Sequence, residues 1–266
     1  MAKRKPLNPK FIDELKSPDY KVRRDAVNAI GKSRDERAVD LLLPMLNDKT
    51  ITVRTRAVVW LLRQNDPRVI RPLVPLLADK ACHVHRPIAE QLPKFGEDTI
   101  LVLLETLDDP NPDLRCAAVS LLGRMKETRA VKKLVELLED NNQRVRWRAL
   151  DAISDIADPR TADILYKAAL TPYSEAETSP YTPSAIKVIA VSGLFRLQDQ
   201  RLFDVLIDML EDPMYRWRAA SMLGELGDTR AIEPLQTKLS LRPNNRVEQS
   251  FLKTAIEKLE SLINTN

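Results

Sequence analysis

The feature that most constrains the fold of this chain is a segment of about 31 residues that recurs along nearly its whole length. An apolar residue in front of a recurring arginine marks corresponding positions, and the first four steps between these positions are 31, 31, 30 and 31 residues. We call these positions anchors; they are Val22, Val53, Val84, Leu114, Val145 and Tyr215. Self-similarity at such a fixed period is the sequence signature of a repeat protein.

Each unit has the pattern of two helices. The second carries apolar residues at the anchor, anchor +4 and anchor +8, as in Val145, Ala149 and Ile153, which is one face of a 3.6-residue helix. It closes near a glycine such as Gly31 or Gly123, which permits a left-handed exit or close packing. So small a helix pair cannot bury its apolar stripe alone, so like units must stack. The sequence therefore predicts an all-α, right-handed α–α superhelix of about eight two-helix repeats.

We expect one repeat domain over residues 1–266. A step of 70 residues between Val145 and Tyr215 hides a sixth repeat, for which Ser184 is taken as the anchor. The extra residues form an irregular, proline-rich loop at 171–183, which either contacts a partner or is a tolerated insertion. The expected repeats cover about residues 8–37, 38–68, 69–99, 100–129, 130–160, 161–201, 202–230 and 231–263.

The segment 109–140 identifies the type of repeat. It runs from Asp109 through Leu114-Arg115 to Leu122-Gly123, continues with an acidic–x–Arg turn, and ends in a Leu-x-x-Leu-Leu-x-Asp motif at Asp140. This pattern resembles the HEAT-like repeats of the phycobilisome-lyase type. The resemblance implies a HEAT-like solenoid over essentially the whole chain. It also implies an alternative function, that of a phycobilin lyase subunit or a chaperone-like factor acting on phycobiliproteins.

Two polar positions recur in nearly every unit, the arginine after the anchor and the aspartate after the first helix. Recurrence of this kind favours a structural role, with each guanidinium bound to a carboxylate or a helix-end carbonyl of a neighbouring repeat. Binding of a ligand by this row is the alternative. The predicted structural ladder consists of Arg23, Arg54, Arg115, Arg146, Arg216, Asp48, Asp79, Asp109, Asp140 and Asp212.

Positions that vary between units indicate where a partner would bind. Anchor +10 reads Lys32, Arg63, Lys94 and Arg124 in the first four repeats, and then Asp155, Leu194 and Glu225. A concave face lined by second helices would thus be positive in its N-terminal half and neutral to acidic afterwards, which suits a partner with an acidic patch. An ordinary solvated charged face is the alternative.

Two tryptophans, Trp147 and Trp217, share anchor +2, where they either anchor a partner or pack between repeats. The residues predicted to bind a protein partner on the concave face are Arg56, Arg63, Lys94, Arg124, Trp147, Arg148, Trp217 and Arg218.

No pattern in the sequence indicates catalysis, and we predict no catalytic residue, metal or cofactor. Only 6 glycines are present, and no glycine-rich phosphate loop occurs. The one metal-like cluster is Cys82-His83-Val-His85 with Cys116, which lacks a second cysteine pair. HEAT-like DNA glycosylases suggest a minor alternative, a DNA-binding or repair protein with Trp147 and Asp151 as a matching pair. The net charge of only +4 makes nucleic acid an unexpected partner.

Two cysteines, no apolar stretch of about 18 residues and a basic start without an apolar run predict a cytoplasmic protein without a membrane span or secretory signal. The function that we expect is that of a non-catalytic scaffold or adaptor, which could form a hetero-oligomer with its protein partner. If the chain is an enzyme, the resemblance implies one of the bilin-lyase type.

Overall fold

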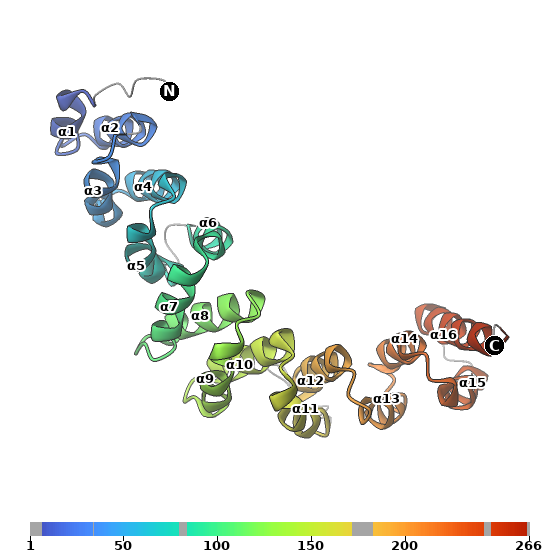
Figure 1. The fold of residues 1–266 in the computed structure, drawn as a ribbon. Helices are drawn as coiled ribbons and strands as arrows, with labels where there is room; N and C mark the ends of the chain where they lie inside the picture. The colour runs from blue at the N-terminus through green and yellow to red at the C-terminus, as the bar shows by residue number, and fades with distance from the viewer. Residues whose placement is uncertain (1–6, 34, 80–83, 172–182, 242–245, 265–266) are drawn as a thin grey trace. The chain divides into compact units, whose positions relative to one another are not determined.

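The computed structural model describes residues 7–33, 35–79, 84–171, 183–241 and 246–264 (Figure 1). Within these residues every regular element is an α-helix or a short 3-10 helix, and no strand occurs. The α-helices of the described ranges form eight successive pairs, each with a shorter first helix and a longer second helix. The predicted all-α fold of two-helix repeats is therefore confirmed.

The helices of the eight pairs alternate along the chain. The first helices are α1 (Pro9–Glu14), α3 (Ala38–Leu42), α5 (Ile70–Leu73), α7 (Glu97–Thr106), α9 (Val131–Glu136), α11 (Ala162–Ala169), α13 (Leu202–Met209) and α15 (Ile232–Ser240). The second helices are α2 (Tyr20–Ser33), α4 (Ile51–Gln64), α6 (His85–Gln91), α8 (Pro112–Arg124), α10 (Gln143–Ile156), α12 (Pro183–Leu197), α14 (Arg216–Leu226) and α16 (Arg246–Asn264).

Short 3-10 segments begin or extend many of these helices. Several have a proline as their first or second residue, because proline lacks a backbone N–H and so fits the first turn of a helix. The segments are η1 (Leu43–Asn47), η2 (Pro67–Val69), η3 (Val74–Leu77), η4 (Leu92–Phe95), η5 (Thr128–Ala130), η6 (Leu137–Glu139), η7 (Pro159–Thr161) and η8 (Thr229–Ala231).

Contacts divide the chain into two compact units, unit 1 (residues 1–152) and unit 2 (residues 153–266), with the boundary inside α10. Within each unit the first helices lie in one layer and the second helices in another (Figure 1). We call the solvent-exposed side of the second layer the second-helix face. The single domain over residues 1–266 stays a prediction, and residues 172–182 of the predicted loop lie outside the described residues.

The core lies between the two layers and is built from the stripe that the sequence predicts. In α10, Val145, Ala149 and Ile153 are fully buried, and Leu150 beside them is almost so. The corresponding residues of α4, which are Val53, Ala57 and Leu61, are also fully buried. Because such residues touch the next helix pair as well as their own, each repeat completes its core only with its neighbours.

The glycines near the ends of second helices allow close packing. A Cβ on Gly31 would lie 2.2 Å from the Trp60 ring, and one on Gly123 would lie 2.8 Å from Cβ of Ala152. Both glycines are inside helices, so they do not provide the left-handed exit that the sequence also allowed. The second helix of the following repeat can pack closely at Gly31 and Gly123 because glycine has no Cβ.

The left-handed exit falls at a constant position, twelve residues after the anchor. Asn65, Lys126, Ala157 and Gly227 have positive φ angles at this position in their repeats. Gln198, with φ of 54°, is the corresponding residue of the sixth repeat. Counting back twelve residues from Gln198 places the sixth anchor at Ile186, so the sequence-based choice of Ser184 is wrong by two residues.

The corrected register gives new positions to two residues of the sixth repeat, Lys187 and Leu194, of which Leu194 was expected at the exposed anchor +10. Lys187 is 3% exposed and occupies the position of the recurring arginine, and Leu194 is fully buried at anchor +8. The residue at anchor +10 is therefore Arg196, which is exposed. The expected loss of positive charge after the fourth repeat is thus interrupted in the sixth.

Candidate functional site

The recurring arginine joins neighbouring repeats most completely in α2 and α8. Arg23 Nε and Nη2 donate to the two carboxylate oxygens of Asp48 at 2.7 and 2.9 Å, and both side chains are about 5% exposed. Its Nη1 donates to the carbonyl of Ser17 at 2.8 Å. One guanidinium therefore holds both the turn before its own helix and the end of the next first helix.

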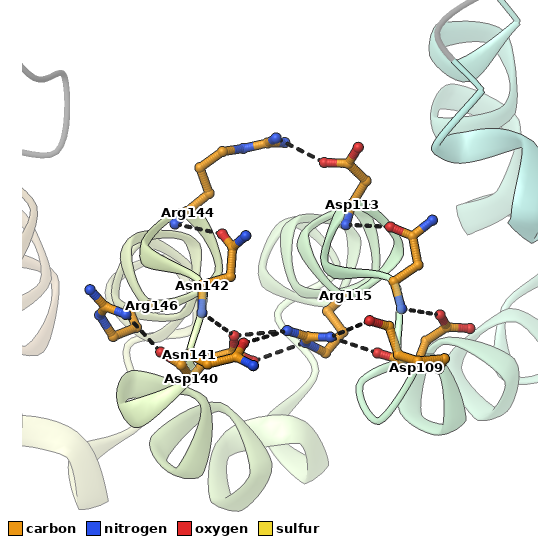
Figure 2. A network of polar contacts seen from close by, with 10 residues as sticks. Asp109, Asp113, Arg115, Asp140, Asn141, Asn142, Arg144 and Arg146 are labelled. Carbon is orange, nitrogen blue, oxygen red and sulfur yellow. Dashed lines mark hydrogen bonds and ion pairs between the residues drawn. The ribbon is translucent and has the colours of Figure 1, made fainter.

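Arg115 makes the same contacts in the fourth repeat (Figure 2). Its Nε and Nη2 bind the carboxylate of Asp140 at 2.9 and 2.8 Å, while Nη1 donates to the carbonyl of Asp109 at 2.7 Å. Asp140 also accepts the backbone N–H of Asn142 at 2.8 Å. Burial acts to raise the pKa of Asp140, but the hydrogen bonds from Arg115 and Asn142 outweigh it, and the pKa is lowered. The pKa of Asp48 is lowered by its hydrogen bonds from Arg23.

Other predicted ladder residues make further contacts at the same turns. Arg54 and Arg146 each donate through Nη1 to the backbone carbonyl of the preceding aspartate, Asp48 or Asp140. Asp109 and Asp212 cap turns by accepting the backbone N–H two residues on. Asp79 lines a cavity at the end of η3.

Three repeats replace a member of the ladder. His85 stands where the third repeat would have its arginine and is exposed. Lys187 takes this place in the sixth repeat and pairs with Asp208 at 3.0 Å. In the last repeat the position holds Glu248, which is 5% exposed and accepts from Arg216 Nη1 at 2.8 Å. Sequence reasoning missed Lys187 and Glu248, although both follow an apolar residue in the register of the repeat.

A second guanidinium network lies at the turn between repeats, where the sequence shows only an acidic–x–Arg motif. Glu127 accepts both the backbone N–H and the guanidinium of Arg129, and Arg129 reaches Glu97 of the preceding first helix at 2.8 Å. Arg68 joins Asp66 to Asp40 in the same way. Hydrogen bonds from these arginines lower the pKa of Glu127 and Asp66. This network holds the first-helix layer.

The residues predicted to bind a partner are placed mostly at the surface. Arg56, Arg63, Lys94, Arg124 and Arg148 are exposed. Trp217 is 38% exposed, whereas Trp147 and Arg218 are half-buried. Six of these residues belong to unit 1, while Trp217 and Arg218 belong to unit 2, so they form two surfaces that are described separately.

Four cations lie at anchor +10 of the first four repeats, and we call Lys32, Arg63, Lys94 and Arg124 the cation row. All four are exposed, and within the described residues no ion pair involves them. Lys94 donates to Gln91 at 2.7 Å, and the Arg63 guanidinium lies 4.9 Å from the centre of the Trp60 ring. These contacts are with uncharged groups, so the positive charge of the row is not neutralised by them.

Acidic residues on the same helices are already paired. Asp25 binds Arg24, Glu90 binds Arg86, and Asp113 binds Arg144 at 2.8 Å (Figure 2). Asp151, the residue that a DNA-glycosylase-like site would use, lies 3.5 Å from Arg148. On the second-helix face of unit 1, these carboxylates therefore form ion pairs, whereas the cation row makes none within the described residues.

The three tryptophans differ in what they contact. Trp60 packs on Gly31 and donates through Nε1 to Asn28 at 2.9 Å, so it lies between α2 and α4. The Arg148 guanidinium lies 4.8 Å from the centre of the Trp147 ring. Trp217 contacts Phe251 with ring centroids 5.3 Å apart and lines a hollow of about 330 Å³ in unit 2. Phe251 was not identified from the sequence.

A cavity of about 520 Å³ lies in unit 1 between α6, α8 and α10, bordered by His85, Cys116 and Arg148. Burial raises the pKa of the Cys116 thiol, which keeps it protonated and a poor nucleophile. Among the described residues no group of three or more potential ligands could hold a metal ion. Cys82 and His83 of the metal-like cluster lie outside the described residues.

In the parts of the chain that the structure describes, no helix has the length and apolar composition to cross a bilayer.

Catalytic groups were not predicted, and the surface with the most distinctive chemistry in unit 1 is the cation row. It combines exposure, regular spacing and charge, which are properties of a recognition surface.

Two family models match the chain. The model described as HEAT repeats matches residues 8–92 and 100–179, which together make up more than half of the sequence. The model described as PBS lyase HEAT-like repeat matches residues 215–240. No curated protein matches the chain.

Solved structures that are similar to the chain include three that cover nearly all of it. An engineered protein is 17% identical, with a TM-score of 0.47, covering 95% of this chain and 78% of its own. The CpcE–CpcF complex of phycocyanin lyase from Nostoc sp. PCC7120 is 18% identical, with a TM-score of 0.34 and 97% of each chain covered. The YibA protein of Escherichia coli is 23% identical, with a TM-score of 0.42, covering 94% of this chain and 80% of its own.

Proposed function

Because the chain belongs to the HEAT-repeat family, we propose that it is a non-catalytic adaptor that binds a protein partner on the second-helix face of unit 1. The observation that carries this proposal is the cation row, whose four members are exposed and make no ion pair within the described residues. Arg56, also exposed and not ion-paired there, adds a further positive charge on α4. A protein with an acidic patch would supply the missing carboxylates, giving a hetero-oligomer.

An ordinary solvated face would be expected to mix its charges. Acidic residues of these helices are paired in this way, since Asp25, Glu90 and Asp113 each bind a nearby arginine. Cations at the ends of helices also favour the helix dipole, by about 0.3–1 kcal/mol each, and this accounts for single members of the row. It does not explain why, within the described residues, none of the four members makes an ion pair. A one-sign surface of this kind speeds and orients the approach of an oppositely charged protein.

Reversing three charges of the row together, with Arg63→Glu, Lys94→Glu and Arg124→Glu, is expected to abolish capture of the partner from a lysate of the source organism. Each exposed pair contributes about 0.2–1 kcal/mol, and reversal replaces attraction by repulsion, so affinity for the identified partner should fall on the order of 100-fold. The measurement is affinity capture followed by titration of the captured protein. Helix content should be retained because all three side chains are exposed, and the melting temperature should fall only modestly, since loss of each favourable helix-end charge costs about 0.3–1 kcal/mol.

The matched control reverses three exposed lysines elsewhere, with Lys49→Glu, Lys132→Glu and Lys167→Glu. This variant has the same net charge as the first, so it separates the position of the charge from its amount. Equal capture by both variants and by the unmodified chain would show that the second-helix face of unit 1 does not bind the partner.

A second candidate function is that of a bilin lyase subunit or a chaperone-like factor for phycobiliproteins. It is favoured by the match of residues 215–240 to the PBS lyase HEAT-like repeat. Mixing the purified chain with a bilin and an apo-phycobiliprotein would test it, because covalent attachment changes the absorbance spectrum of the bilin. The adaptor proposal expects no change beyond that seen without the chain, and a protein-dependent new band would favour the lyase function instead.

A further inference from the structure

We propose that the cation row binds an extended acidic segment of the partner, with carboxylates about three residues apart, so that successive carboxylates line up with the cations of successive repeats. This inference rests on the proposed adaptor function and specifies the ligand of that surface. It is carried by a contact elsewhere in the same chain that shows how residues at anchor +10 of consecutive repeats meet.

Unit 2 contains this contact. Asp155 and Arg196 both occupy anchor +10, in the fifth and sixth repeats, and Arg196 Nη2 lies 3.3 Å from Asp155 Oδ1. Arg196 Nη1 also donates to the carbonyl and the hydroxyl of Ser154 at 3.1 and 2.9 Å. Residues at this position in consecutive repeats are therefore close enough for a carboxylate to bind a guanidinium. In the first four repeats anchor +10 holds a cation in every repeat, and within the described residues none of these cations binds a carboxylate.

The ends of consecutive second helices also lie close together in unit 1. Gln64, one residue after Arg63, donates through Nε2 to the carbonyl of Gly31 at 3.2 Å. Gly31 directly precedes Lys32, so the first two members of the row stand on adjoining helix ends. A carboxylate placed between them would be near both cations.

The spacing of the row fits one backbone conformation well. Packed helices have axes about 8–10 Å apart, so successive cations stand roughly that far from each other. A polyproline II segment turns once in three residues and rises about 3.1 Å per residue, so every third side chain faces the same side at about 9.3 Å. A segment of about ten residues would therefore present four carboxylates to the four members of the row.

A helical partner fits this surface less well. Helices bind in grooves through a stripe of apolar side chains. In unit 1 the large apolar side chains exposed among the described residues are Tyr20, Ile51 and Leu101. Tyr20 and Ile51 begin α2 and α4, at the opposite ends of these helices from Lys32 and Arg63. The row thus offers charge without an apolar groove, which suits an extended polar segment.

The test uses synthetic peptides and the full-length chain, with fluorescence anisotropy at about 0.1 M salt, where charges remain in range over about 10 Å. The first peptide has ten residues with glutamate at positions 1, 4, 7 and 10, separated by proline and serine. The second has the same composition with its four glutamates contiguous. A longer helix-forming peptide with glutamate at every seventh position and a single-stranded oligothymidylate are the other two probes.

We expect the spaced peptide to bind about tenfold more tightly than the contiguous one. Lys94→Gln should weaken its binding by about two- to fivefold, as expected for one exposed ion pair, and Lys132→Gln on the first-helix layer should leave it unchanged. Equal dissociation constants for the two ten-residue peptides would overturn the inference. Tighter binding of the helical peptide or of the oligothymidylate would overturn it as well, in favour of a helical or a nucleic-acid ligand.

Failure of this inference can be told from failure of the adaptor proposal. If the triple reversal of Arg63, Lys94 and Arg124 abolishes capture of the partner but the spaced peptide shows no preference, only the extended acidic ligand is wrong. If the triple reversal leaves capture unchanged, the surface itself is not the binding site, whatever the peptides do.

Discussion

Replacing Arg115 by alanine is expected to lower the free energy of unfolding by about 3–5 kcal/mol, the usual cost of removing one partner from a buried ion pair. The side chains of Arg115 and Asp140 are 11% and 7% exposed, so the variant would leave the carboxylate buried without its counter-charge. The carbonyls of Asp109 and Pro110 would lose their donor as well. Urea unfolding followed by circular dichroism measures the change.

Arg144→Ala is the matched control, because Arg144 lies in the same neighbourhood but binds Asp113 near the surface (Figure 2). The two side chains are 46% and 26% exposed, and loss of such a pair should cost less than about 1 kcal/mol. Adding Asp140→Leu to Arg115→Met should recover part of the loss, since no isolated charge remains buried. Similar costs for Arg115→Ala and Arg144→Ala would contradict the assignment of Arg115 to the link between repeats.

The second large effect is expected for Ala149→Asp in α10. Ala149 is fully buried between the two helix layers, so its replacement places an unpaired carboxylate, and the extra volume of that group, in a filled core. The free energy of unfolding should fall by about 3 kcal/mol or more. Thermal and urea unfolding both report this loss.

Ala117→Asp provides the comparison on the neighbouring helix α8. Ala117 is half-buried and borders the open cavity of unit 1, so the new carboxylate can reach solvent. Its cost should stay near 1 kcal/mol, the centre of the distribution for single substitutions. An unchanged melting temperature for Ala149→Asp would mean that the apolar stripe faces another direction than the period predicts.

The repeat period made most of the fold predictable. Side chains at anchor +4 and +8 recur with the same burial because every unit meets the same two neighbours, so Ala149 and Ile153 could be placed without coordinates. The predicted register of the sixth repeat was wrong for a physical reason. Its second helix is apolar on several sides, and Gly193 stands at the spacing from Ser184 that other glycines have from their anchors. Two registers then satisfy the pattern, and only Lys187, Leu194 and the backbone of Gln198 distinguish them.

The candidate site was predictable in composition but less so in its contacts. Exposure of Arg63 and Arg124 follows from their place on a helix opposite the apolar stripe. The pairing of Asp155 with Arg196 depends on the corrected register, and the role of Trp60 depends on the absence of a side chain at Gly31. Such contacts join residues 29 to 42 positions apart, for which a single sequence carries no local signal.

The double attachment of Arg23 and Arg115 has a consequence for how this chain can change its length in evolution. At the Arg23–Asp48 and Arg115–Asp140 junctions, one repeat supplies the guanidinium and the following repeat supplies the carboxylate. Duplicating or deleting a whole repeat built in this way leaves donors and acceptors equal in number at such a junction. Loss of a fraction of a repeat would instead leave a charge buried without its counterpart, so gene rearrangements are tolerated in steps of one complete helix pair.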